Sequence, residues 1–120
     1  MPDLTKKKCV PCEGGIDPLP REKVEGNLKA VPGWILQQTQ DAKGVHDQIV
    51  REFKFKDFKS ALGFVNKVGE LAEAEGHHPN IYLYGWNKVR LELSTHTIGG
   101  LSENDFIIAA KVNALEPSNI

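Results

Sequence analysis

Residues 73–105 read EAEGHHPNIYLYGWNKVRLELSTHTIGGLSEND, and this stretch contains the turn signals that decide the fold. A helical pattern that runs into the stretch stops at Gly76, and Pro79 prevents the helix from resuming. Two short segments of alternating apolar and polar residues follow, separated by a turn that contains a glycine. The stretch therefore predicts the end of a helix followed by a β-hairpin with strands at residues 80–84 and 88–95.

The helix that ends at Gly76 has the clearest pattern in the chain. Asp57 is a good N-cap, and the segment after it repeats apolar residues at spacings of three and four. The apolar positions are Phe58, Ala61, Leu62, Val65, Val68, Leu71 and Ala72. This spacing predicts an amphipathic helix whose apolar stripe packs against the core.

Two more strands are expected before this helix, at residues 34–39 and 45–55, joined by a polar turn. The second strand nearly alternates between apolar and polar positions. One face is predicted to lie in the core and carries Val45, Ile49, Phe53 and Phe55. The opposite face is predicted to be exposed to solvent and carries His46, Gln48, Glu52 and Lys54.

Helices at both ends complete the expected order. A short helix begins near Arg21 and is stopped by Pro32, and a final helix is capped by Ser102. The order helix, two strands, helix, two strands, helix predicts an α+β fold with a single four-stranded antiparallel sheet and three helices on one face. We expect an irregular arm at residues 1–20 and a single domain at residues 21–120.

Composition narrows the class of protein. The chain has 120 residues, 40% of them hydrophobic and 26% charged, with a net charge of -1. A chain of this length forms one domain with one core. The charge balance gives no overall attraction to nucleic acid, and no apolar run is long enough to cross a membrane. The start of the sequence lacks a secretory pattern, so we expect a cytoplasmic protein without direct nucleic acid or membrane contacts.

Three histidines are expected to meet at one end of the hairpin. A turn centred between Gly85 and Lys88 places His77 opposite a position between residues 94 and 98, a window that contains His96. His78 adjoins His77, although neighbouring side chains of an extended segment diverge. In the phase of its strand, His96 points away from the apolar face. The sequence therefore predicts a cluster of His77, His78 and His96.

The cluster alone leaves acid/base catalysis, metal binding and surface histidines open. The helical pair of histidines four residues apart that is common in zinc sites is absent, and adjacent histidines chelate one ion poorly. Glu73 could hydrogen-bond an imidazole or lie in solvent. Asp105 could complete the cluster or only cap the last helix. Trp86, roughly 25 Å from His77 along the strand, is assigned to core or interface packing.

The N-terminal arm contains one further motif. Cys9 and Cys12 form a single CxxC, which is too little for a structural zinc site and lacks a thioredoxin-like context. Reduced, exposed thiols are the favoured interpretation, with redox or metal roles as alternatives. The lysine clusters at residues 6–8 and 54–59 are interpreted as solvated surface.

A family resemblance rests on the spacing of the same residues. An acidic residue, three intervening positions and His-His-Pro are followed at set intervals by an aromatic residue, a histidine and an aspartate. The matching positions are Glu73, His77, His78, Pro79, Trp86, His96 and Asp105. This pattern resembles the pterin-4a-carbinolamine dehydratases. PGW at residues 32–34 and REFKFKDF at residues 51–58 extend the resemblance over nearly the whole chain.

The resemblance implies a lyase that removes water from 4a-hydroxytetrahydropterin to give the quinonoid dihydropterin, in the recycling of tetrahydrobiopterin. It implies His77 and His96 as an acid/base pair, with His78 positioning the substrate or sharing the proton transfer, and no metal or redox cofactor. Imidazole suits this chemistry because its ordinary pKa lies near neutrality. The residues expected to bind or orient the pterin are Glu73, Ser94, Thr95 and Asp105.

The same resemblance implies a homo-oligomer, either a dimer or a tetramer. It also supplies a rival class of function, because relatives act as dimerisation cofactors of a transcription factor or are linked to hydroxylase regulation. A binding module of that kind would use an exposed helix or sheet edge instead of the histidines. No sequence feature names a protein partner.

Overall fold

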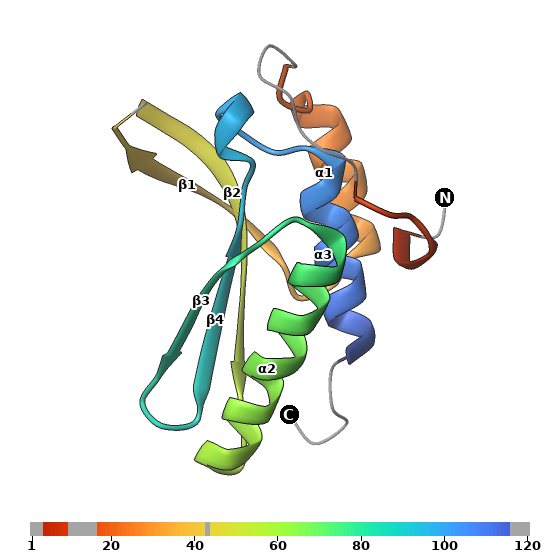
Figure 1. Cartoon of the computed structure of the whole chain (residues 1–120). Coiled ribbons are helices and arrows are strands. Elements are labelled where there is room, and N and C mark those ends of the chain that lie inside the picture. Colours follow the sequence, from red (N-terminus) through yellow and green to blue (C-terminus); the bar gives the residue numbers. More distant parts are fainter. Residues whose placement is uncertain (1–3, 10–16, 43, 116–120) are drawn as a thin grey trace.

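The structure is a computed structural model that describes residues 4–9, 17–42 and 44–115, apart from the side chains of Asp41 and His96 (Figure 1). The described residues form three α-helices and four strands in the predicted order, with two short 3-10 helices. The elements are η1 (Leu4–Lys6), α1 (Arg21–Ala30), β1 (Ile35–Asp41), β2 (Gly44–Lys54), α2 (Phe58–Glu75), β3 (Asn80–Tyr84), β4 (Lys88–Leu93), η2 (His96–Ile98) and α3 (Glu103–Leu115).

The four strands form one antiparallel sheet in the order β1-β2-β4-β3. Ile35 pairs with Val50 across β1 and β2, and Ile49 pairs with Leu93 across β2 and β4. All three α-helices lie on the same side of this sheet (Figure 1). The predicted α+β fold, with a four-stranded antiparallel sheet and helices on one face, is confirmed.

Local chemistry sets the ends of α2. The carboxylate of Asp57 accepts a hydrogen bond from the backbone N–H of Ser60 at 2.7 Å, and Gly76 ends the helix in the left-handed region at φ 69°. Both roles follow from the sequence, because Asp is a favoured N-cap and glycine adopts positive φ without strain. The chain therefore leaves α2 at a defined angle directly before His77.

The apolar stripe of α2 is narrower than predicted. The buried ridge follows Ala61, Phe64, Val68 and Ala72 at helical spacing. Phe58 and Leu62 lie beside this ridge and are 50% and 41% exposed, so their assignment to the core is wrong. An amphipathic pattern predicts which side of a helix turns inward, whereas the neighbouring elements decide how much of that side is covered.

The prediction for β2 is wrong at its N-terminal half. Ile49 and Phe53 are buried as expected, but Val45 is 62% exposed because the β1–β2 hairpin diverges from the helices at this end (Figure 1). On the face predicted to be exposed to solvent, His46 and Gln48 are buried. The amide of Gln48 donates to Gln37 Oε1 at 3.1 Å, so cross-strand polar side chains cover part of this face.

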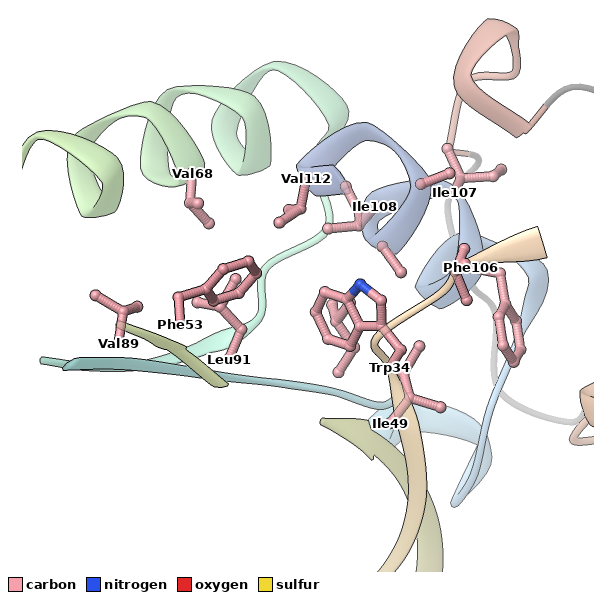
Figure 2. Close-up of a cluster of buried hydrophobic side chains, with 14 of the residues drawn as sticks. Trp34, Ile49, Phe53, Val68, Val89, Leu91, Phe106, Ile107, Ile108 and Val112 are labelled. Carbon is pink, nitrogen blue, oxygen red and sulfur yellow. The ribbon is translucent and has the colours of Figure 1, made fainter. Parts of the chain in front are cut away.

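The core lies between the sheet and α2 and α3. Figure 2 shows Phe53, Val89 and Leu91 of the sheet below Val68 of α2 and Ile108 of α3. Helix α3 is buried along most of its length because it packs against α1, α2 and η1. Its apolar run at residues 106–110 is buried without a break, which is expected of a helix covered on several sides.

The described part of the N-terminal arm packs onto the domain. Leu4 of η1 is buried in the core, and η1 contacts α3. Lys7 forms an exposed ion pair with Glu103, while Lys6 and Lys8 are exposed.

Cys9 is partly buried against the core, so the interpretation of its thiol as exposed is wrong. Cys12 lies outside the described residues. Within residues 4–9, 17–42 and 44–115, no helix has the length and apolar character needed to cross a membrane.

Candidate active site

The β3–β4 hairpin brings the expected site residues to one end of the sheet. Asn80 pairs with Glu92 and Tyr84 with Lys88, which centres the turn on Trp86. Continuing this register past Asn80 places His77 opposite Thr95, inside the predicted window. The proximity of His77 to the end of β4 therefore follows from the turn.

Strand β4 is shorter than predicted because it ends at Leu93 and not at residue 95. Thr95 instead forms an isolated bridge with Gly100, and the segment between them turns through η2. Gly99 has a φ of 68°, which the absence of a side chain permits. This loop leads directly into α3 and so brings the end of β4 to the helix that carries Asp105.

Asp105 is the centre of a buried hydrogen-bond network. His77 Nε2 lies 2.6 Å from Asp105 Oδ1, and the two side chains are 12% and 0% exposed. The second oxygen, Oδ2, accepts hydrogen bonds from Thr95 Oγ1 at 2.9 Å and from the backbone N–H of Ser102 at 3.0 Å. Both oxygens of this fully buried carboxylate are therefore hydrogen-bonded, as burial of a charge requires.

The contacts around Asp105 define the tautomer of His77. An ionised carboxylate only accepts hydrogen bonds, so a hydrogen bond to ionised Asp105 requires the proton on His77 Nε2. In a neutral ring the basic nitrogen is then Nδ1. Asp105 thus holds the imidazole in one orientation.

The two alternatives for Asp105 are compatible. Its contact with the Ser102 backbone N–H is a helix-capping interaction at the start of α3, and its contact with His77 joins the helix to the hairpin. Ser102 also has a second role, because its hydroxyl lies 2.8 Å from Thr95 Oγ1. The sequence predicted Ser102 only as an N-cap, and the pattern Ser-x-x-Asp contained no signal for the contact with Thr95.

His78 forms a separate pair on the surface. Its Nε2 lies 2.7 Å from Glu73 Oε1, and the side chains are 57% and 81% exposed. Glu73 thus contacts an imidazole, as one of the sequence alternatives held, but the imidazole is that of His78. His77 and His78 diverge, as expected for adjacent side chains in an extended segment.

The remaining site candidates are placed by their backbone. His96 begins η2 directly after Thr95, at the same end of the hairpin as His77. Because β4 ends at Leu93 and His96 belongs to η2, the strand phase from which its direction was predicted does not extend to this residue. Ser94 is partly buried between the end of β4 and Thr95. The structure therefore brings His77, Thr95 and Asp105 into one network and places Ser94 and His96 beside it along the chain.

Two other expectations concern residues outside this network. Trp86 at the hairpin tip is 61% exposed with a φ of 57°, so its assignment to core packing is wrong and an interface role stays a prediction. Among the described side chains, which exclude that of His96, no group of three His, Cys, Asp or Glu residues is arranged to hold a metal ion.

Comparison with known proteins supplies the family. Residues 17–115 match the sequence profile described as pterin 4 alpha carbinolamine dehydratase. A protein of Methylococcus capsulatus, provisionally named a pterin-4-alpha-carbinolamine dehydratase, is 52% identical over 93% of this chain and 92% of its own length. Pterin-4-alpha-carbinolamine dehydratase 2 of Arabidopsis thaliana, a mitochondrial protein, is 41% identical over 100% of this chain and 63% of its own length.

A solved structure agrees with these relatives. The crystal structure of a transcriptional coactivator/pterin dehydratase from Brucella melitensis has a TM-score of 0.70 and 34% sequence identity, and it covers 84% of this chain and 100% of that one. The family profile spans the elements that carry the candidate site, from α1 to α3. The chain belongs to the pterin 4 alpha carbinolamine dehydratase family.

Proposed function

We propose that this chain is a hydro-lyase that dehydrates 4a-hydroxytetrahydropterin to the quinonoid dihydropterin. Family membership and the names of the relatives support the substrate class. The observation in the structure that carries the proposal is the 2.6 Å contact between His77 Nε2 and the fully buried Asp105. A histidine oriented in this way is suited to proton transfer.

The reaction requires one proton to be removed and one to be supplied. The N5–H bond of the substrate breaks, its electron pair forms the N5–C4a double bond, and the C4a–O bond breaks as the hydroxyl leaves. The hydroxyl takes up a proton and departs as water. An imidazole that accepts the N5 proton and a second imidazole that protonates the hydroxyl therefore complete the reaction.

We assign the two proton transfers to His77 and His96. His77 Nδ1 is the basic nitrogen that the contact with Asp105 leaves for the substrate. His96 follows Thr95 in the chain, which is bonded to the same carboxylate. His78, paired with Glu73 on the surface, is assigned to substrate positioning, with Glu73 orienting its ring.

The assignment of Thr95 is refined by its contacts. Its hydroxyl bonds Asp105 and Ser102, and its backbone N–H donates to the carbonyl of Gly100 at 2.8 Å. These groups are engaged within the protein, so we assign Thr95 to positioning Asp105 instead of direct contact with the pterin. Ser94, one residue earlier, remains the proposed contact to the substrate.

The test is the rate of carbinolamine dehydration by purified His77→Ala and His96→Ala variants, measured in excess of the uncatalysed reaction. We expect turnover to fall by about 10² to 10⁴-fold in each, the usual contribution of general acid-base catalysis, while circular dichroism stays unchanged. A folded double variant that dehydrates the substrate at the wild-type rate would contradict the proposal.

A second candidate function is regulatory binding, because the Brucella relative is described as a transcriptional coactivator as well as a pterin dehydratase. We also propose a homo-oligomer, since β1 and β3 are sheet edges and Tyr82, Tyr84 and Trp86 near one edge are exposed. Sedimentation velocity measures the oligomeric state. The variant in which His77, His78 and His96 are all replaced by alanine tests the binding function. A partner that co-purifies equally with wild type and with this variant supports a binding function independent of the histidine site.

A further inference from the structure

Glu75, the last residue of α2, lies two residues before His77 and is held from two sides. Its Oε2 lies 2.6 Å from Lys111 Nζ of α3, and the two side chains are 9% and 16% exposed. Its Oε1 accepts a hydrogen bond from the backbone N–H of Cys9 at 2.9 Å. The carboxylate therefore connects the end of α2 with α3 and with the N-terminal arm.

The arm closes this connection on the side of Asp105. Cys9 Sγ lies 3.7 Å from the backbone oxygen of Asn104, the residue directly before Asp105. Lys7 pairs with Glu103 at 2.9 Å, one residue earlier still. The two elements that carry His77 and Asp105 are thus joined through a cluster of Cys9, Glu75, Asn104 and Lys111, which we call the Glu75 cluster.

The charges and protons of the cluster are consistent with a fixed arrangement. The pKa of Glu75 is lowered, first by the hydrogen bond from Lys111 and then by that from the Cys9 backbone. Burial, and then the neighbouring Glu75 carboxylate, raise the pKa of the Cys9 thiol to about 12. The thiol therefore stays protonated and donates to the Asn104 carbonyl, a structural role and not that of a reactive nucleophile.

Gly76 makes the cluster relevant to His77. It is the single residue between Glu75 and His77, and it adopts the left-handed conformation at φ 69°. The backbone N–H groups of Gly76 and His77 both donate to the Ala72 carbonyl, at 2.9 and 3.3 Å, so the turn is tied to the end of α2. The position of His77 relative to α3 therefore depends on how the end of α2 is held against α3. The Glu75 carboxylate, before Gly76, is bound to Lys111, and the His77 imidazole, after Gly76, is bound to Asp105. The side chains on both sides of Gly76 therefore contact α3.

We propose that Glu75 is a positioning residue that, through Lys111 and the Cys9 backbone, sets the distance between the His77 and Asp105 side chains. A contact of 2.6 Å tolerates little displacement of α2 relative to α3. Small displacements of a catalytic group reduce rates strongly. The kinetic consequence rests on the proposed dehydratase function, whereas the geometric consequence does not.

The test compares Glu75→Gln with Glu70→Gln, a matched control at an exposed position on the same helix. Glu75→Gln keeps the shape of the side chain and removes its charge. We expect kcat for carbinolamine dehydration to fall by about tenfold with KM changed less than about twofold. The ¹⁵N chemical shifts of the His77 ring, which report its tautomer and hydrogen bond, are expected to move in Glu75→Gln and to stay in Glu70→Gln.

A double-mutant cycle with Lys111→Met tests whether Glu75 acts on His77 through its contact with Lys111. If Glu75 acts through Lys111, the combined variant shifts the His77 ring signals no further than the larger single effect. Unchanged ring signals in Glu75→Gln, with only a lower melting temperature, would show a purely structural ion pair and overturn the proposal. The NMR result stands even if the chain proves not to dehydrate pterins, so the two proposals fail separately.

Discussion

His77 and His78 are adjacent in the chain and make nearly equal contacts to carboxylates, yet their surroundings differ. His77 lies 2.6 Å from Asp105 with side chains 12% and 0% exposed, and His78 lies 2.7 Å from Glu73 with side chains 57% and 81% exposed. Water screens the second pair and competes for its hydrogen bond. The comparison shows that burial, more than distance, separates an imidazole held in a fixed position from one whose contact with a carboxylate is open to water.

Glu75 is intermediate between the two carboxylates. Its side chain is 9% exposed, and both of its oxygens have partners within the protein. The three acidic groups Asp105, Glu75 and Glu73 therefore form a series of increasing exposure around the same turn. Substitutions along this series are expected to have decreasing effects.

The largest effect is expected from Asp105→Asn. The amide nitrogen that replaces one carboxylate oxygen is a donor, so it meets a donor at Thr95 and the Ser102 backbone, or at His77 unless that ring moves its proton to Nδ1. We expect the free energy of unfolding to fall by about 3 kcal/mol and turnover by about 10²-fold. Denaturant unfolding and the dehydration assay measure the two, and Glu103→Gln on the exposed side of α3 is the control. A variant of wild-type stability would remove the distinction between the buried and exposed pairs.

A smaller effect is expected from Thr95→Val, which keeps the shape of the side chain and removes the hydroxyl between Asp105 and Ser102. Asp105 retains its contacts with His77 and the Ser102 backbone. We expect a loss of about 1 to 2 kcal/mol in unfolding free energy, the usual cost of one unsatisfied buried partner. Ser94→Ala, one residue earlier, serves as the comparison, and an equal loss there would place the effect in the loop and not in the hydroxyl.

The third prediction concerns how the stability of the fold changes at acidic pH. The pKa of Glu75 is lowered from 4.5 in the folded protein, so its charged form stabilises the fold above that pH, and this contribution is lost as the pH falls through the folded value. Wild type should therefore be more stable than Glu75→Gln at pH 7, with a difference that shrinks below about pH 4.5. Denaturant unfolding across this range is the measurement. A difference independent of pH would mean that the charge contributes nothing.

The smallest effect is expected from Glu73→Gln. Exposed ion pairs contribute little, so unfolding free energy should change by less than about 0.5 kcal/mol. If Glu73 only orients an exposed His78, turnover should change by less than about threefold. The same assays measure both values. A loss comparable to that of Asp105→Asn would break the comparison and place His78 at the centre of the chemistry.

Strong local signals explain why the fold could be predicted. Asp57, Gly76 and Pro79 define the ends of α2 through capping, positive φ and the missing N–H of proline. The turn around Trp86 sets the register of β3 and β4, and that register brings His77 to the level of Thr95. These effects depend on residues close together in the chain, so a sequence pattern contains them.

Exposure could not be predicted in the same way. Val45 and His46 alternate as a half-covered strand should, but the hairpin end leads away from the helices and the opposite face is partly covered. Cys9 was interpreted as part of an exposed arm, although its backbone and thiol contact α2 and α3. Each of these outcomes depends on elements distant in sequence, which periodicity does not report.

The sequence by itself determined the order of elements, the hairpin and the three histidines that belong to one end of it. Only the tertiary structure decided which carboxylate meets which imidazole. Glu73, four residues before His77 in the chain, contacts His78, whereas His77 reaches Asp105 on another helix. The left-handed turn at Gly76 directs the chain toward α3, and packing of α2 against α3 brings the buried carboxylate within reach.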